Sequence, residues 1–153
     1  MERRGKMMRD VQKTIGNMAD RAGNCFISYI DSEGFPVTKA MLKPRQREGI
    51  RIFWFSTNTS SNKVKCFRDN PKASIYFMDR RYFRGVSLSG TVEVLEDPEV
   101  KERLWQEGDT LFDKEGVTDP DYCVLKFTAE KGRYYSNMKS EDFEVSDWQS
   151  NTD

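Results

Sequence analysis

Histidine is absent from this sequence of 153 residues. Its absence excludes Ser-His-Asp and Cys-His catalysis, zinc sites built with histidine, histidine-ligated haem and any imidazole general base. Any chemistry must therefore come from carboxylates, amines, phenols, thiols or a bound cofactor.

Cysteine and long apolar runs are also scarce. Cys25, Cys66 and Cys123 are odd in number, widely spaced and form no Cys-x-x-Cys, so we expect neither a disulfide framework nor a metal site, and a reducing, cytoplasmic environment. No stretch approaches the roughly 20 apolar residues of a membrane-spanning helix. The first 20 residues carry charges throughout and lack the apolar run of an export signal. We therefore expect a chain that is neither exported nor embedded in a membrane.

The size and composition fit one folded domain. The chain is 37% hydrophobic and contains ten Phe, six Tyr and three Trp, which argues against disorder although 33% of its residues are charged. A chain of this length buries enough surface for one core and too little for two. We expect a single domain over residues 1–137, followed by a polar, acidic tail over residues 138–153.

Hydrophobic periodicity predicts the elements of this domain. Apolar residues at helical spacing indicate a helix over about residues 7–22. Runs of β-branched and aromatic residues around a turn at residues 31–34 predict a hairpin of residues 25–30 and 36–42. Further strands are predicted at residues 50–56, 73–78, 86–94, 122–128 and 133–136, and short helices at residues 62–69 and 98–105. Such closely spaced antiparallel strands indicate an α+β domain built around a barrel or strongly curled sheet, because closure removes exposed edges.

The net charge of zero conceals a strong asymmetry along the chain. Residues 1–35 have six basic and five acidic groups, residues 36–84 have twelve and three, and residues 85–153 have seven and seventeen. The basic block contains residues 57–63, where Ser, Thr and Asn precede a predicted helix and Lys63 falls in its first turn. Helix N-termini favour anions, and a lysine there opposes the helix dipole unless an anion is bound. Phosphate is therefore the natural candidate for a ligand of this segment.

Two readings of this segment stay open from the residues alone. In one, the hydroxyl residues only cap the helix and the lysines are solvated. In the other, the strand at residues 36–41 pairs with the strand that begins at residue 50 and brings Lys39 to the same anion.

The order and spacing of several short motifs resemble one known family. The motifs are Pro-Val-Thr-Lys-Ala-Met at residues 36–41, Phe-Trp-Phe-Ser-Thr-Asn at 53–58, Ser-Asn-Lys at 61–63, Asn-Pro at 70–71, Ala-Ser-Ile-Tyr-Phe at 73–77, Val-Ser-Leu-Ser-Gly-Thr-Val at 86–92 and Leu-Trp at 104–105. Over about residues 8–137 the chain resembles the FMN-binding split-barrel family related to pyridoxamine 5'-phosphate oxidase, and within it the general stress protein branch.

This resemblance implies a six-stranded antiparallel split β-barrel with short flanking helices, forming a homodimer with one FMN in each of two clefts at the subunit interface. The family's phosphate-binding Arg and Ser-Arg-Lys carry over to Lys39, Ser61, Asn62 and Lys63. Lys39 keeps the charge of the arginine but loses its bidentate fork, and Asn62 loses the charge, so phosphate binding is expected to be weaker or to draw on Lys43 or Arg84. Along the flavin ring and ribityl chain the family resemblance places Thr38, Lys39, Ala40, Met41, Ser56 and Thr57. Trp105 is interpreted either as packing near the flavin of the other subunit or as a core or interface tryptophan.

The departures from the family limit the function. The true oxidase ends in an Arg-x-His pair that holds its substrate, whereas this chain ends in the polar segment 142–153 and has no histidine. Oxidation of pyridoxamine 5'-phosphate is therefore disfavoured, as are the activities of the haem-degrading and nitroimidazole-resistance relatives, which depend on histidine. We expect an FMN-binding oxidoreductase of unknown substrate, reduced by NAD(P)H or another small donor, with no catalytic residue assigned.

Two alternatives remain from the sequence. One is a flavin-binding carrier or stress-related sensor without turnover. The other is a barrel that binds single-stranded nucleic acid through its basic segment and the aromatic residues Phe53, Phe55, Tyr76, Tyr82 and Phe83. The second is disfavoured because the chain is neutral, with an isoelectric point near 6.4.

Overall fold

The computed structural model describes residues 2–111 and 113–145, with side chains from residue 11 onward. Within them lie three α-helices, which are α1 (Glu2–Arg21), α2 (Asn62–Asp69) and α3 (Pro98–Leu104). The eight strands are β1 (Asn24–Ile30), β2 (Pro36–Leu42), β3 (Gln46–Glu48), β4 (Ile52–Asn58), β5 (Lys72–Asp79), β6 (Arg84–Leu95), β7 (Tyr122–Ser136) and β8 (Lys139–Glu144). Two 3-10 turns, η1 (Asp109–Leu111) and η2 (Gly116–Thr118), precede β7. None of the described helices is long and apolar enough to cross a membrane.

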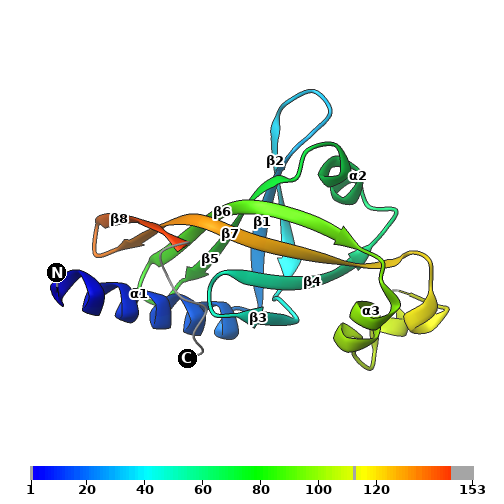
Figure 1. The fold of residues 1–153 in the computed structure, drawn as a ribbon, viewed down its shortest axis with the longest axis horizontal. Helices are drawn as coiled ribbons and strands as arrows, with labels where there is room; N and C mark the ends of the chain where they lie inside the picture. The colour runs from blue at the N-terminus through cyan, green and yellow to red at the C-terminus, as the bar shows by residue number, and fades with distance from the viewer. Residues whose placement is uncertain (1, 112, 146–153) are drawn as a thin grey trace.

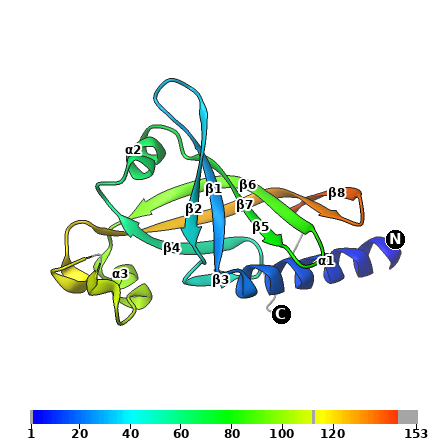
Figure 2. The same cartoon turned by 180° about the vertical axis from the view of Figure 1, so that it is seen from behind.

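All eight strands belong to one antiparallel sheet in the order β2-β1-β5-β6-β7-β4-β3, with β8 added to β7. The sheet curls around a buried interior, with α1 along one end and α2 at the opposite end (Figures 1 and 2). This arrangement confirms the α+β fold. The strand count is eight instead of the expected six.

Two of the differences lie at the C-terminal end. β7 is one strand of 15 residues where two were predicted, because residues 129–132 continue the ladder with β6. β8 lies in the segment expected to be a polar tail, and its sequence lacks the apolar alternation that identifies a strand. Its strand state comes from pairing with β7, as between Gly132 and Phe143, and the Phe143 ring also packs on the core.

The predicted hairpin of β1 and β2 is confirmed, with Ile27 opposite Lys39. The predicted pairing of β2 with the strand after residue 50 is wrong, since β4 lies between β7 and β3. Local pattern indicates that two segments are strands, but it does not determine which distant strands become neighbours.

The sheet buries apolar side chains on both of its faces. The larger cluster fills the interior of the curled sheet and includes Ile15 from α1, Ile27, Phe53 and Phe127. On the other face of β4 and β7, Trp54 and Tyr122 pack with Leu104 from α3. Because side chains alternate along a strand, β4 contributes Phe53 and Phe55 to one cluster and Trp54 to the other.

Gly90 lies at an irregularity in the ladder between β6 and β7. The ladder between these strands shifts register at Ser89 and Gly90, and a Cβ on residue 90 would collide with the backbone carbonyl of Thr128. Only glycine permits this approach without moving backbone.

Gly90→Ala is therefore expected to lower the free energy of unfolding by about 3 kcal/mol, because overpacking against a backbone carbonyl cannot be relieved by a rotamer change. Urea denaturation followed by circular dichroism measures the loss. Gly23→Ala is the matched control, since a Cβ at residue 23 has no neighbour within 4 Å. Equal effects of the two substitutions would contradict the assigned role of Gly90.

Candidate functional site

The N-terminus of α2 carries an unpartnered hydroxyl group. Ser61 is the N-cap of this helix, with φ −68° and ψ 149°, yet its side chain makes no capping hydrogen bond. Its Oγ is buried and has no hydrogen-bond partner among the described residues. The first backbone N–H groups of a helix also lack acceptors within the helix. Several donors therefore converge at this position without an acceptor.

Lys63 adds a buried positive charge to the same helix turn. The residue is 5% exposed, and no ion pair or hydrogen bond joins its ammonium group to another described residue. Burial, and then the positive charge of Lys39, lowers the pKa of Lys63. A buried cation without a counter-ion is costly, so an anion at this position would be strongly favoured.

β1 connects the strand that carries Lys39 with α2. Side chains alternate across β2, so Lys39 lies on the same face as Val37 and Met41, which pack on the interior core. β1 pairs with β2 and also supports α2, where the rings of Tyr29 and Phe67 lie 5.6 Å apart. The charge of Lys39 acts on Lys63, although the strand pairing considered from the sequence is absent.

The loop before α2 is held by the residues that precede β7. The backbone N–H of Ser60 donates to the Asp121 carboxylate at 2.7 Å, and the Ser60 hydroxyl donates to the same carboxylate at 3.1 Å. The Thr59 hydroxyl donates to the carbonyl of Pro120 at 3.1 Å. These two hydroxyls are therefore engaged in structure, and Ser61 is left as the available donor. The Asp-Pro-Asp sequence at 119–121 was the available signal for this clamp.

The other predicted residues divide between two faces of the sheet. Thr38 and Ala40 lie on the outer face of β2, opposite to Lys39 and Met41, and Asn62 is exposed. Ser56 lies on the face that carries α3, whereas Thr57 pairs with Cys123 and faces the interior. Ser61 and Lys63 thus share the start of α2, with the charge of Lys39 acting on Lys63, whereas Thr38 and Ala40 lie on an outer surface.

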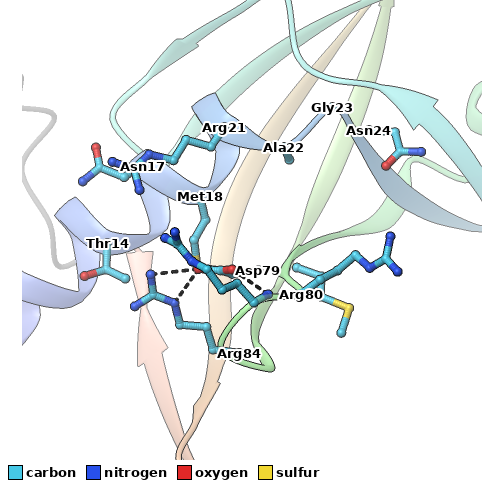
Figure 3. A pocket seen from close by; sticks show the side chains of 12 residues that line it. Thr14, Asn17, Met18, Arg21, Ala22, Gly23, Asn24, Asp79, Arg80 and Arg84 are labelled. Carbon is cyan, nitrogen blue, oxygen red and sulfur yellow. Dashed lines mark hydrogen bonds and ion pairs between the residues drawn. The ribbon is translucent and has the colours of Figure 1, made fainter.

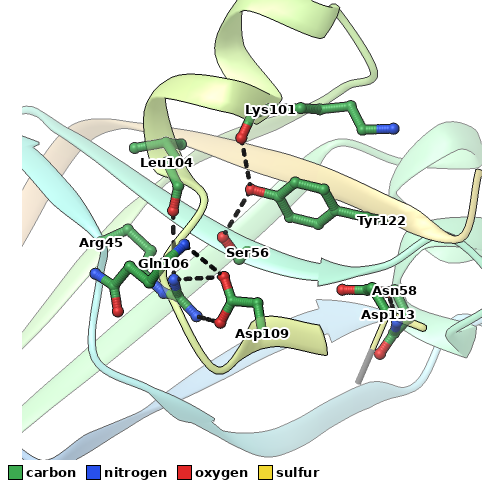
Figure 4. A network of polar contacts seen from close by, with 9 residues as sticks. All are labelled: Arg45, Ser56, Asn58, Lys101, Leu104, Gln106, Asp109, Asp113 and Tyr122. Atoms are coloured by element: carbon green, nitrogen blue, oxygen red, sulfur yellow. Dashed lines mark hydrogen bonds and ion pairs between the residues drawn. The ribbon is translucent and has the colours of Figure 1, made fainter. Parts of the chain in front are cut away.

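Trp105 joins the Ser56 side of the sheet. Its indole packs edge-on against Tyr122, with centroids 5.1 Å apart. The Tyr122 hydroxyl donates to the carbonyl of Lys101 at 3.0 Å and lies 3.3 Å from the Ser56 Oγ (Figure 4). Trp105 therefore packs against the α3 cluster within its own subunit.

An ion pair that the sequence did not reveal fixes the segment next to this cluster. Arg45 donates two hydrogen bonds to the Asp109 carboxylate, at 2.8 and 2.9 Å, and a third, at 3.3 Å, to the carbonyl of Leu104 (Figure 4). Burial opposes ionisation of Asp109, but the bonds from Arg45 and from the backbone of Gln106 outweigh it and lower the pKa of Asp109. The pair connects the chain after β2 to η1 across 64 residues.

Lys43 and Arg84, the other basic residues considered for the phosphate, lie elsewhere. Lys43 follows β2 and lines a cavity of about 580 Å³ together with Arg45 and Gln106. Arg84 begins β6 and pairs with Asp79 at 3.0 Å. The Arg84 side chain is therefore at the other end of β5 from α2.

Asp113 lies among other carboxylates, beside the C-terminal end of β4. It is 5% exposed and accepts a hydrogen bond from Asn58 Nδ2 at 2.8 Å. Burial raises its pKa, and the charges of Asp119, Asp121 and Asp109 raise it further. The folded state thus binds this proton more tightly than the unfolded chain does, and the ionised group reduces stability at neutral pH.

Asp113→Asn is expected to raise the urea midpoint at pH 7, because the amide oxygen can keep the bond from Asn58 while the buried charge is removed. The gain should shrink as the pH falls towards 3.8, the ordinary pKa of the group, where the wild-type carboxyl is increasingly protonated. Glu130→Gln, on the exposed part of β7, serves as the control. A gain that is independent of pH would contradict the assignment.

Comparison with known proteins places this geometry in a family. The sequence profile of pyridoxamine 5'-phosphate oxidase matches residues 13–136, whereas no curated protein matches the sequence. A Clostridium acetobutylicum protein related to general stress protein 26 of Bacillus subtilis, of the pyridoxinephosphate oxidase family, is 34% identical with a TM-score of 0.83 over 90% of this chain and 96% of that one.

More distant structures share the fold. General stress protein 26 of Bacillus anthracis is 16% identical, with a TM-score of 0.70 over 88% of this chain and 98% of that one. A heme binding protein from Mycobacterium smegmatis is 15% identical, with a TM-score of 0.67 over 84% of this chain and 55% of that one. The profile match and the 34% identity together show that the chain belongs to the pyridoxamine 5'-phosphate oxidase family, in the branch that includes proteins related to general stress protein 26.

Proposed function

We propose that this protein binds FMN at the N-terminus of α2 and acts as a flavin-dependent oxidoreductase on a substrate other than pyridoxamine 5'-phosphate. The observation that carries the proposal is the buried, unpartnered pair of Ser61 Oγ and Lys63 at a helix N-terminus. A phosphate group supplies both the acceptor for the hydroxyl and the counter-charge for the ammonium group.

Each residue at this end of the molecule has a distinct part in holding a phosphate. The Ser61 hydroxyl and the first backbone N–H groups of α2 donate hydrogen bonds, and Lys63 supplies a charge from which water is largely excluded. Lys39 adds a second charge from β2, in place of the family's arginine. FMN, when bound, supplies the redox chemistry, while the protein supplies position and electrostatics.

The absence of histidine bears on the alternatives within this family. A haem-binding member exists among the structural neighbours, but this chain offers no imidazole ligand. Pyridoxamine 5'-phosphate oxidation is disfavoured for the same reason, since the residue pair that holds that substrate is missing. A flavin carrier or sensor without turnover shares every contact described for the phosphate, and only kinetics separate it from an enzyme.

The outer face of the sheet supports a homodimer. Phe26 pairs with Ala40 on β2 and with Tyr76 on β5, and all three face outward. Phe26 is 41% exposed and Tyr76 38% exposed. Exposed apolar patches of this kind mark interaction surfaces, and we propose a second copy of the chain as the partner, as in related proteins whose subunit interface holds the flavin.

Purification under non-denaturing conditions tests the proposed cofactor. A yellow protein that releases FMN on denaturation is expected, and anaerobic mixing with NADH or NADPH should bleach the bound flavin. A preparation that shows a haem absorption band, or a colourless one that is not stabilised by added FMN, would overturn FMN binding. Bound FMN that no donor reduces would leave the carrier or sensor as the function.

Lys63→Ala is expected to weaken FMN binding by roughly ten- to a hundredfold and riboflavin binding far less, because the lost interaction is with the phosphate. Ser61→Ala should also weaken FMN binding, while leaving the flavin-free protein as stable or more stable, since an unsatisfied buried hydroxyl is removed. Flavin fluorescence quenching measures both affinities.

Lys65→Ala is the matched control, because Lys65 is an exposed lysine on the same helix. Its FMN affinity should equal that of the wild type. Equal losses of FMN and riboflavin affinity in Lys63→Ala would refute the phosphate role of this lysine.

Phe26→Asp is expected to convert the dimer into a monomer by placing a charge in the centre of the apolar outer face. Light scattering on a sizing column should give twice 17.9 kDa for the wild type and 17.9 kDa for the variant. Leu111→Asp, at an 83% exposed residue of η1, should remain dimeric. A dimeric Phe26→Asp protein would show that subunits associate through another surface.

A further inference from the structure

A second cationic site lies at the end of the molecule opposite to α2. A cavity of about 490 Å³ opens between the C-terminal half of α1 and the turn that joins β5 to β6. Four arginines line it, which are Arg21, Arg80, Arg81 and Arg84, and Asp79 is the one carboxylate among its lining residues. Figure 3 shows Arg84 beside Asp79, with Arg21 on the helix and Arg80 extending from the turn in another direction.

Asp79 stabilises the turn between β5 and β6 through hydrogen bonds to its own residues. Its carboxylate accepts a bond from Arg84 Nε at 3.0 Å and another from the backbone N–H of Arg81 at 3.1 Å. The ring of Tyr82 then packs against both guanidinium groups, with the Arg81 Cζ at 4.5 Å and the Arg84 Cζ at 5.1 Å from its centroid. Phe83 completes the turn with a φ of 45°. Two of the four arginines are thereby held in place before any ligand arrives.

The charge in this cavity is not balanced. Among the described residues, no carboxylate forms an ion pair with Arg21, Arg80 or Arg81, and the single charge of Asp79, which pairs with Arg84, cannot balance four arginines. Three positive charges without an ion-pair partner therefore line the same cavity, which favours a ligand of negative charge. The two parallel N–H groups of a guanidinium match two oxygens of a phosphate group. A guanidinium is also more weakly hydrated than an ammonium group, so it loses its water more easily on binding.

This cavity is separate from the proposed flavin phosphate site. None of its lining residues belongs to β2, β4 or α2. β5 starts just after α2 and carries the chain over eight residues to the turn, a path of roughly 25 Å for a strand. The helix α2 and the turn accordingly lie at opposite ends of the sheet in both views (Figures 1 and 2).

We propose that this arginine cavity binds a small ligand with two or more phosphate groups. The volume lies within the range of small-molecule sites, about 300 to 1,000 Å³. Thr14, Asn17 and Asn24 add neutral hydrogen-bonding groups to the lining, and Met18 and Met78 add apolar surface. The unpaired arginines come from two elements, Arg21 from α1 and Arg80 and Arg81 from the turn, so a ligand with several phosphate groups offers a separate acceptor to each element.

A nucleic acid strand or an anionic membrane fits these observations less well. The cavity is concave and walled on one side by α1, whereas a strand or a bilayer needs an extended surface. The Tyr82 ring, which could otherwise stack on a base, is already in contact with two guanidinium groups.

Titration calorimetry with inorganic pyrophosphate, at constant ionic strength, tests the proposal on the full-length protein. The variant Arg21→Gln/Arg80→Gln removes two unpaired charges from two different elements. Its pyrophosphate affinity should fall at least about tenfold, the effect of losing one charge-assisted hydrogen bond. The control Arg51→Gln/Arg68→Gln removes the same charge from exposed positions and should bind like the wild type. Thermal melting confirms that each variant is folded.

Lys63→Ala separates the two sites, and it should retain the pyrophosphate affinity of the wild type. Loss of binding in Lys63→Ala but not in Arg21→Gln/Arg80→Gln would assign pyrophosphate to α2 and overturn the proposal. Equal losses in the arginine variant and its control would also overturn it, as would an absence of saturable binding. If a labelled oligonucleotide or phosphatidylglycerol vesicles bind through these arginines while pyrophosphate does not, the cavity is instead part of a macromolecular surface.

Discussion

The double-sided burial of β7 is the constraint on which the rest of the structure depends. This strand pairs with β6 along one edge and with β4 and then β8 along the other, and its first residues face two different clusters. Tyr122 anchors the α3 cluster through Trp105 and Ser56, while Cys123 lies in the interior beside Thr57. Because both sides of β7 are packed, β4 cannot shift in register without placing apolar side chains in water. The end of β4, and with it the start of α2, is held in position by this requirement.

The interaction of Ser60 with Asp121 extends the constraint to the candidate site. It ties the loop before α2 to the residue that precedes β7, so the helix N-terminus is positioned without the help of its own N-cap hydroxyl. A serine that caps its helix has no donor to spare, whereas Ser61 is released from that task. The same loop therefore fixes the start of α2 and leaves the Ser61 hydroxyl free to donate a hydrogen bond beside the buried Lys63. Preorganisation of this kind reduces the ordering cost of binding an anion.

The sequence was most informative where pattern is local. The β1–β2 hairpin and α2 follow from periodicity and turn residues, and Lys63 follows from its place in the first turn. The sequence did not predict which distant segments contact each other. The polar β8 has no alternation of its own, the neighbour of β2 was misassigned, and the Arg45–Asp109 pair joins residues that are 64 positions apart. The sequence offered a pairing of β2 with β4 as the way to bring Lys39 towards Lys63, whereas in the structure β2 pairs with β1 and the charge of Lys39 still acts on Lys63. The division of Thr38 and Lys39 between two faces could be read from alternation only once the partner strand and the core face were known.

The charge pattern gains a second meaning from the fold. The twelve basic residues of segment 36–84 look like one phosphate site in the sequence, but β5 separates them in space. The charge of Lys39 acts on Lys63 in α2, whereas Arg80, Arg81 and Arg84 line a cavity with Arg21 at the opposite end. The two groups differ in chemistry as well as in place. A buried lysine without a partner favours one compact anion. Several arginines on an ordered turn and the neighbouring helix favour a ligand with several phosphate groups. A neutral chain without histidine can therefore carry two anion sites, because what selects a ligand is the local surplus of charge and the geometry of its donors, and neither is visible in the net charge.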